Sequence, residues 1–176
     1  MKSSSYIAGI RIDKKSFYIR ATALKTVLLF SLLVTGLVTL SQSKYVSKFR
    51  PMADSLSAIY GVPVSVMLGV AIMESGSGTS RNCKLLNNHF GIVGKNNLLK
   101  TKGIRSRYKQ YPDALASYVD FCKLMTRKKF YTRLKGNMDH RLWADAISKA
   151  GYSEIPEIWK QRLLSIIKKN KLASLQ

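Results

Sequence analysis

One carboxylate, Glu74, ends an apolar segment that has the spacing of a helix. Met67, Val70 and Ala71 precede it by seven, four and three residues, so they share its helical face. Gly76 can take the left-handed conformation that closes a helix, which places Glu74 in the last turn. Burial and the negative end of the helix dipole both raise the pKa of such a carboxyl. A carboxyl that stays protonated near neutral pH can donate its proton to a leaving glycosidic oxygen. The alternative is an exposed glutamate with no chemical role.

The N-terminal part of the chain has the pattern of a membrane-targeting segment. Residues 26–40 carry no charge, and residues 1–25 hold several Lys and Arg against one acid, Asp13. A basic leader before an apolar run indicates export, with the N-terminus in the cytoplasm. No A-x-A cleavage site follows, so we favour a retained anchor over a cleaved signal. The expected organisation is a cytoplasmic leader at 1–25, a transmembrane anchor at 26–43, a connector at 44–51 and a catalytic domain at 52–172.

The charge balance is strongly basic, with 30 Lys and Arg against 9 Asp and Glu in 176 residues. Nucleic acid is the usual partner of such a chain, but a DNA-binding helical protein would require a cytoplasmic domain. Export favours a polyanionic wall or a membrane surface instead, and no nucleic acid. The run from Lys95 to Lys109 contains six cations and no acid, and it is either a substrate-binding segment or a solvated loop.

Cysteine and histidine are scarce. Cys83 and Cys122 could form a disulfide in an oxidising compartment, although the sequence does not show that they are close. Their spacing matches no zinc site, and His89 and His140 form no cluster. We therefore expect no metal and no cofactor.

The exported part reads as a mainly helical domain. The pattern predicts helices over residues 52–60, 63–74, 80–87, 113–126, 139–149 and 156–169, with a small irregular β lobe over residues 90–112. The apolar spacing places Ile59, Leu115 and Ile158 on the inner faces of their helices.

Four motifs occur in order along this part. They are YGVPVSVMLGVAIMESGSG at 60–78, NNHFGI at 87–92, YKQYPDALASYVDF at 108–121 and AGYSEIPEIW at 150–159. With these motifs, residues 46–170 resemble the peptidoglycan-hydrolysing N-acetylglucosaminidases of glycoside hydrolase family 73. The resemblance implies a lysozyme-like helical domain with a small β lobe. It also implies a bacterial protein of the inner membrane, single-pass, whose catalytic domain lies outside the cytoplasm and acts on peptidoglycan glycan strands.

The resemblance also assigns roles to single residues. Glu74 matches the family's catalytic glutamate, and Tyr152 matches its active-site tyrosine, although Tyr152 could instead be a core aromatic. The substrate-binding candidates are Asn87, Asn88, Phe90, Tyr111 and Tyr118. Each of these has an alternative use in turn closure or inward packing.

The chain departs from the family pattern at the second carboxylate. Residues 81–112, which include the expected lobe, contain no Asp or Glu. Glycosidases ordinarily use a pair of carboxylates. Asp113 is the nearest acid, but its position is that of a helix cap. We therefore expect Glu74 to work largely alone as acid, with the sugar's own 2-acetamido group stabilising the anomeric centre.

Two other functions remain open at this point. A muramidase or lytic transglycosylase could use the same fold and a single glutamate, although transglycosylases generally have a Gly-Leu-Met-Gln-like stretch where this chain has NNHFGI. A wall-binding scaffold without turnover is the alternative that is not an enzyme. The intact order of Glu74 and Tyr152 favours the enzyme.

Overall fold

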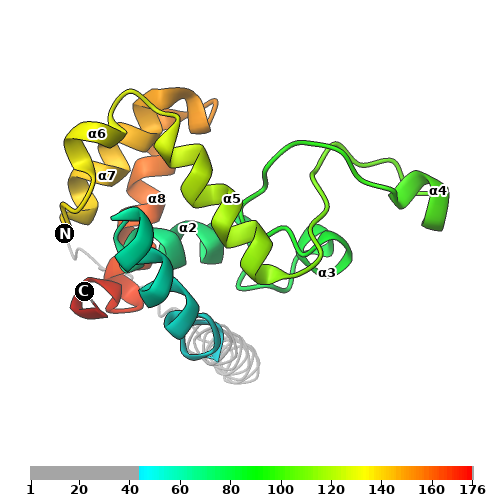
Figure 1. Cartoon of the computed structure of the whole chain (residues 1–176), viewed down its shortest axis with the longest axis horizontal. Helices are drawn as coiled ribbons and strands as arrows, with labels where there is room; N and C mark the ends of the chain where they lie inside the picture. Colours follow the sequence, from blue (N-terminus) through cyan, green and yellow to red (C-terminus); the bar gives the residue numbers. More distant parts are fainter. Residues whose placement is uncertain (1–43, 176) are drawn as a thin grey trace, which may run out of the picture. The chain divides into compact units, whose positions relative to one another are not determined.

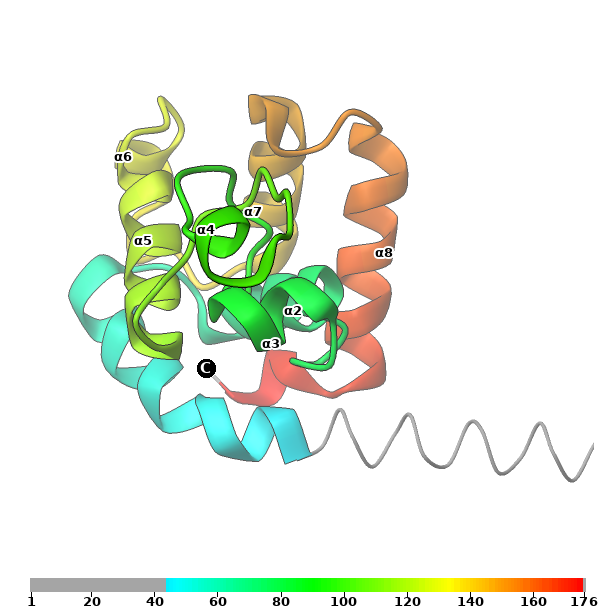
Figure 2. The same ribbon diagram turned by 90° about the vertical axis from the view of Figure 1, so that its right-hand side faces the viewer.

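In the computed structural model, which describes residues 44–175, helix α2 (Val64–Ser75) is the central element. Every α2 residue from Val64 to Ile72 is buried, and a helix that is buried all round needs neighbours on all sides. Those neighbours include α8 (Pro156–Lys169), α7 (His140–Ile147) and η2 (Leu172–Leu175). Figure 2 shows α5 and α8 on opposite sides of α2.

The remaining elements complete a mainly helical domain, as expected from the sequence (Figure 1). They are a helix over residues 44–60, α3 (Arg81–Leu86), α4 (Leu98–Lys102), α5 (Ala114–Thr126), α6 (Tyr131–Leu134) and η1 (Ser148–Tyr152). Asp113 and Asp139 cap α5 and α7 by accepting hydrogen bonds from the amides of Ala116 and Arg141. These caps confirm the predicted start of both helices.

The first described helix begins earlier than the sequence indicated. Residues 44–51, expected to be a connector, are helical and continue to residue 60. Tyr45 and Phe49, four residues apart, share one buried face. The Tyr45 hydroxyl hydrogen-bonds to His89 Nδ1 at 2.6 Å and to the Tyr118 hydroxyl at 3.0 Å. This helix therefore packs against the loop that follows α3.

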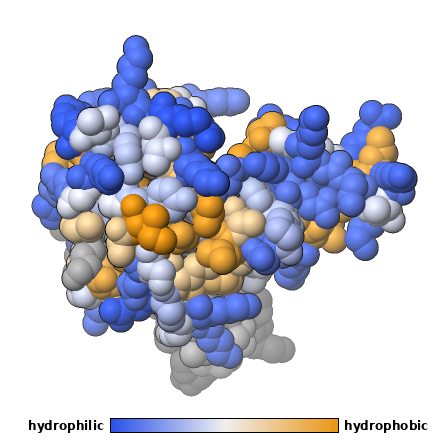
Figure 3. Space-filling view, in the orientation of Figure 1, coloured by the Kyte–Doolittle hydropathy of each residue, from blue (hydrophilic) through white to orange (hydrophobic). Residues whose placement is uncertain are grey.

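The expected β lobe is almost devoid of β structure. Residues 90–112 contain one isolated antiparallel bridge, between Val93 and Tyr108, and the short helix α4. The Asn96 amide joins the two sides by donating to the carbonyls of Ser106 and Tyr108, both at 2.8 Å. Figure 1 shows this segment projecting from the helical body, and Figure 3 shows that its surface is largely hydrophilic.

Three residues expected to face inward are exposed. Ile59, Leu115 and Ile158 are 65%, 50% and 47% exposed. Their helices lie at the surface of a small domain. Each helix buries only a narrow stripe of its surface, and these apolar side chains lie outside that stripe. The prediction of their burial is wrong for this reason.

The two cysteines do not form a disulfide. Both thiols are free and buried. Cys122 Sγ donates to Met67 Sδ at 3.5 Å, and its burial raises the pKa of the thiol to about 12. Cys83 Sγ lies 3.6 Å from each ring nitrogen of His89. The disulfide that the sequence allowed is therefore absent between these residues, because each thiol packs against its own neighbour in the core.

Within residues 44–175 the structure has no helix with the length and apolar character needed to cross a bilayer. The anchor expected over residues 26–43 and the leader before it lie outside the described residues.

Gly69, the glycine within α2, lies close against side chains of α8. A Cβ at this position would lie 2.8 Å from Leu163 Cδ1 and 3.0 Å from Ile167 Cγ1. We expect Gly69→Val to lower the free energy of unfolding by about 1–3 kcal/mol, the usual cost of an overpacked core. Gly69→Ala is the matched control, since its gain of about 1 kcal/mol in helix propensity offsets part of the crowding. Chemical denaturation measures both, and a Val variant as stable as the wild type would contradict this packing.

Candidate active site

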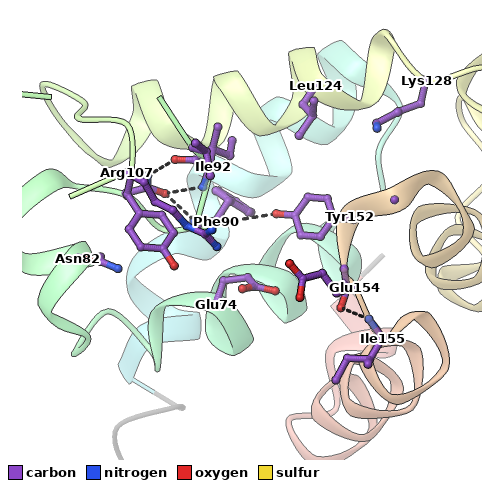
Figure 4. A pocket seen from close by; sticks show the side chains of 16 residues that line it. Glu74, Asn82, Phe90, Ile92, Arg107, Leu124, Lys128, Tyr152, Glu154 and Ile155 are labelled. Atoms are coloured by element: carbon purple, nitrogen blue, oxygen red, sulfur yellow. Dashed lines mark hydrogen bonds between the residues drawn. The ribbon is translucent and has the colours of Figure 1, made fainter. Parts of the chain in front are cut away.

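A cleft of about 610 Å³ opens at the end of α2. Its walls come from five separate parts of the chain, several of which are labelled in Figure 4. The lining residues are Glu74 and Asn82, the loop residues Asn88 and Phe90 to Val93, Arg107 and Tyr108 of the returning segment, Leu124 and Lys128, and Gly151 to Ile155. Segments far apart in the sequence therefore meet around one carboxylate.

Glu74 is held in place by an aromatic donor. The indole N–H of Trp159, in α8, donates to Glu74 Oε1 at 2.9 Å. An N–H donor favours an unprotonated oxygen as its acceptor, so the acid proton belongs on Oε2. Oε2 faces Gly91, where an added Cβ would lie only 3.4 Å away. The proton is thus carried by the oxygen nearer the cleft-lining loop.

The surroundings of Glu74 keep it protonated to a higher pH than an ordinary glutamate. Burial raises the pKa of its carboxyl, and the hydrogen bond from Trp159 opposes part of this rise. Gly76, with φ 56°, ends α2 directly behind the catalytic turn, and its amide bonds to the carbonyl of Ile72. A half-buried carboxylic acid beside a solvent-filled cleft is suited to general acid catalysis.

The loop over Glu74 is organised by Asn88. Its side-chain oxygen accepts from the amides of Phe90 and Ile92 at 3.3 Å and 3.1 Å. Its nitrogen donates to the carbonyls of Ile92 and Lys109 at 2.9 Å and 2.8 Å. All of its hydrogen-bonding capacity is used on backbone. Asn88 lines the cleft and shapes the loop, and its role in binding sugar stays a prediction.

Tyr152, the last residue of η1, hydrogen-bonds to the same loop. Its hydroxyl donates to the Phe90 carbonyl at 2.8 Å, and its ring lies beside Trp159 with centroids 5.3 Å apart. Burial, followed by the charge of Glu74, holds the pKa of Tyr152 well above its usual range. Tyr152 is therefore a neutral hydrogen-bond donor at the cleft, adjacent to the catalytic carboxyl.

Phe90 supports the cleft from below. It is 1% exposed, stacks on Phe121 at 4.3 Å between centroids, and meets the Tyr118 ring edge-on. The ring is therefore largely used in packing, and its contact with substrate stays a prediction.

Three other substrate-binding candidates do not line the cleft. The Asn87 amide donates to the carbonyls of Tyr111 and Pro112 and so closes the turn after α3. Tyr111 is buried and its hydroxyl donates to Asp120 at 2.8 Å. Tyr118 is wholly buried in the core. Each side chain has an internal packing or hydrogen-bonding use, and its role in substrate binding stays a prediction.

The sequence reading missed two residues beside Glu74. Neither Trp159 nor Glu154 was assigned a role from the sequence. Both lie in the AGYSEIPEIW motif, which was a signal that they belong near Tyr152. Of the basic run, Arg107 lines the cleft, whereas Lys109 pairs with Asp120 at 2.7 Å.

No group of three or more His, Cys, Asp or Glu side chains within residues 44–175 is placed to bind a metal ion. The chemistry available in the cleft is that of the carboxyls, the Tyr152 hydroxyl and the basic groups of Arg107 and Lys128.

A helical domain with a half-buried glutamic acid at an open cleft has the features of a glycoside hydrolase of the lysozyme-like class. The family model described as glucosaminidase, mannosyl-glycoprotein endo-β-N-acetylglucosaminidase, matches residues 50–172. The chain therefore belongs to this glucosaminidase family, glycoside hydrolase family 73, as its motifs indicated. A comparison with curated proteins finds no match.

Solved structures share the fold. The catalytic domain of the autolysin Auto from Listeria monocytogenes is similar with a TM-score of 0.64 at 21% identity, over 77% of this chain and 88% of that one. The glycoside hydrolase domain of FlgJ from Salmonella typhimurium gives 0.59 at 23% identity, over 76% and 90%. A peptidoglycan hydrolase from Sphingomonas sp. A1 gives 0.59 at 23%, over 76% and 92%. At these identities the likeness shows the fold alone.

The hydrogen bond between Trp159 and Glu74 leads to a prediction about pH. An acid catalyst works below its pKa and fails as the pH rises through it. Trp159→Phe removes a bond that favours the ionised carboxylate, so it raises the pKa of Glu74. We therefore expect the alkaline limb of the kcat profile to move to higher pH. Profiles of both proteins on purified glycan strands measure it, and a limb that moves to lower pH would contradict the assigned bond.

Proposed function

We propose that this protein is a cell-wall hydrolase that cleaves the β-1,4 bond after N-acetylglucosamine within peptidoglycan, with Glu74 as the general acid. The observation that carries the proposal is the environment of Glu74. One carboxyl oxygen is held by Trp159, and the other faces the loop that lines the cleft. A fixed acid in a cleft formed by several chain segments can protonate the oxygen that leaves when a glycan strand is cut.

The comparisons support the same reaction. The family description names an endo-acting N-acetylglucosaminidase, which agrees with cleavage inside a glycan. Two of the similar structures are those of an autolysin and a peptidoglycan hydrolase. Both support a bacterial wall as the substrate over the glycoprotein sugars that the family is named for.

Tyr152 has a supporting role in this proposal. Its hydroxyl is a neutral donor next to Glu74, and its bond to the Phe90 carbonyl holds the loop that forms the opposite wall. A substrate that accepts a hydrogen bond from Tyr152 would take this hydroxyl from the Phe90 carbonyl. The loop must then keep its shape through other hydrogen bonds. The four hydrogen bonds of Asn88 serve this purpose.

We also propose that residues 26–43 anchor the protein in the inner membrane with the domain outside the cytoplasm, where its substrate lies. The basic leader and uncharged run support this orientation. Alkaline phosphatase fused after residue 45 should then be active in cells. An inactive fusion at normal expression would place the domain in the cytoplasm and remove it from the wall.

The reaction is tested with Glu74→Gln in the full-length protein. Glutamine keeps an oxygen that can accept from Trp159 but has no acid proton. We expect wall lysis to fall by at least about a hundredfold, the usual contribution of a general acid, while wall binding persists. Activity that survives the substitution would contradict the role of Glu74.

The cleaved bond is identified from the same digests. Borohydride reduction marks the new chain ends, and mass spectrometry reads them. Reduced N-acetylglucosamine is the expected end. Reduced or anhydro-muramic acid would instead identify a muramidase or transglycosylase, and a wild-type protein that binds walls without releasing any ends would be the scaffold.

A further inference from the structure

Eight of the chain's nine acidic residues lie in the described part, and six of them have a structural task. Two cap helices and four form ion pairs with Lys or Arg. The six are Asp113 and Asp139 as caps, and Asp54, Asp120, Asp145 and Glu157 in ion pairs. The remaining two are Glu74 and Glu154.

Glu74 and Glu154 line the same cleft. Glu74 comes from the last turn of α2, and Glu154 from the loop between η1 and α8. In Figure 4 both carboxylates are directed into the pocket, with Tyr152 beside them. They are the only acidic residues among the described ones that line it. Residues 81–112 contain no carboxylate, but a second one lies in the cleft two residues after Tyr152.

The two carboxyls have opposite surroundings. Glu74 is half-buried and held by Trp159, and this environment favours its protonated form. Glu154 is exposed, and within residues 44–175 its carboxylate has no hydrogen-bond donor or ion-pair partner of its own. Arg107 and Lys128 line the same cleft. One acid and one base in a single cleft is the arrangement that glycoside hydrolysis uses.

The position of Glu154 is set by the backbone around it. Gly151 has φ 75°, a left-handed conformation that turns the chain out of η1. Ser153 then accepts a hydrogen bond from the Ile155 amide at 3.2 Å, which shapes the loop before α8 begins. Tyr152, which is held by its hydrogen bond to the Phe90 carbonyl, precedes Glu154 in the chain. The loop that carries the Glu154 carboxylate is therefore fixed at its N-terminal end.

We propose that Glu154 is the second catalytic residue, the base that activates the attacking water. The inference rests on the proposed function, because it takes Glu74 as the acid of the same reaction. Glu154 removes a proton from water, whose oxygen forms a bond to the anomeric carbon. The bond from that carbon to the glycosidic oxygen breaks, and the oxygen keeps the electron pair and takes the proton of Glu74. Glu74 ends ionised and Glu154 protonated, and exchange with solvent restores both.

This assignment changes the expected stereochemistry. Water activated by Glu154 attacks the face opposite the leaving oxygen, so a β-linked sugar is released as the α anomer. Assistance by the 2-acetamido group, which was expected when no second carboxylate was identified, would release the β anomer instead. The first anomer formed therefore distinguishes the two mechanisms.

The test uses the full-length protein in detergent, with purified glycan strands as the substrate. Proton NMR of the anomeric signal, recorded before mutarotation, is expected to show the α anomer. We expect Glu154→Gln to lower kcat by about 10²–10⁴-fold with little change in KM, the usual loss for a general base. Sodium azide, a nucleophile that needs no base, should restore turnover of this variant and yield the α-glycosyl azide.

The control is Glu157→Gln. Glu157 lies three residues further on, is exposed, and pairs with Lys160 at 2.8 Å. We expect its kcat to stay within about twofold of the wild type, since exposed ion pairs contribute little. Thermal unfolding of both variants should match the wild type, which separates a catalytic loss from a folding loss.

Two results would overturn the assignment. A β anomer as first product, or a Glu154→Gln variant with wild-type kcat, would show that Glu154 is not the base. In either case the proposed function stands if the wild type still releases N-acetylglucosamine ends and Glu74→Gln does not. A wild type that releases no such ends would instead refute the proposed function and this inference with it.

Discussion

The buried helix α2 is the constraint on which the site depends. Residues 64–72 are enclosed by other helices, so the backbone of α2 cannot shift without breaking the core. Met73 and Glu74 are the first residues along α2 that are not fully buried, and the helix ends one residue later. The carboxyl therefore reaches the cleft from the least movable part of the domain. Catalysis requires this, because an acid must be fixed before its substrate arrives.

A second feature is that the walls of the cleft are irregular chain held by hydrogen bonds. The loop at residues 88–92 is shaped by the Asn88 amide, and Tyr152 joins its Phe90 carbonyl to the segment before α8. Trp159 then joins α8 to Glu74. Side chains thus add to the few backbone hydrogen bonds between the two sides of this lobe, such as that from the Lys109 amide to the Ile92 carbonyl. This explains how a nearly strandless lobe can still support a defined site.

Basic and acidic residues have different uses in this protein. Basic residues outnumber acidic ones by more than three to one, and most of the acids are used to cap helices or to pair with Lys and Arg. Arg107 and Lys128 bring positive charge to the cleft itself. A polyanionic wall would be attracted to such a surface, and the two remaining acids, Glu74 and Glu154, line the cleft.

The sequence was sufficient for most of the helices, for the family and for the place of Glu74 in the last turn of α2, because these depend on local signals. Apolar spacing, a glycine after the last turn and aspartate caps act within a few residues of one another. Ile59, Leu115 and Ile158 were misplaced because apolar spacing does not show how much of a surface helix is covered. The free cysteines and the long first helix likewise depended on packing partners distant in the chain.

The composition of the site was decided by the tertiary structure. Trp159 lies 85 residues from Glu74, and only the packing of α8 on α2 brings the indole N–H to the carboxyl. The same packing places Glu154 in the cleft while Tyr111 and Tyr118 go to the interior. Side-chain type shows what chemistry a residue can perform. Whether it meets a substrate depends on contacts between segments that no local pattern encodes, and these contacts exist only once the core has formed.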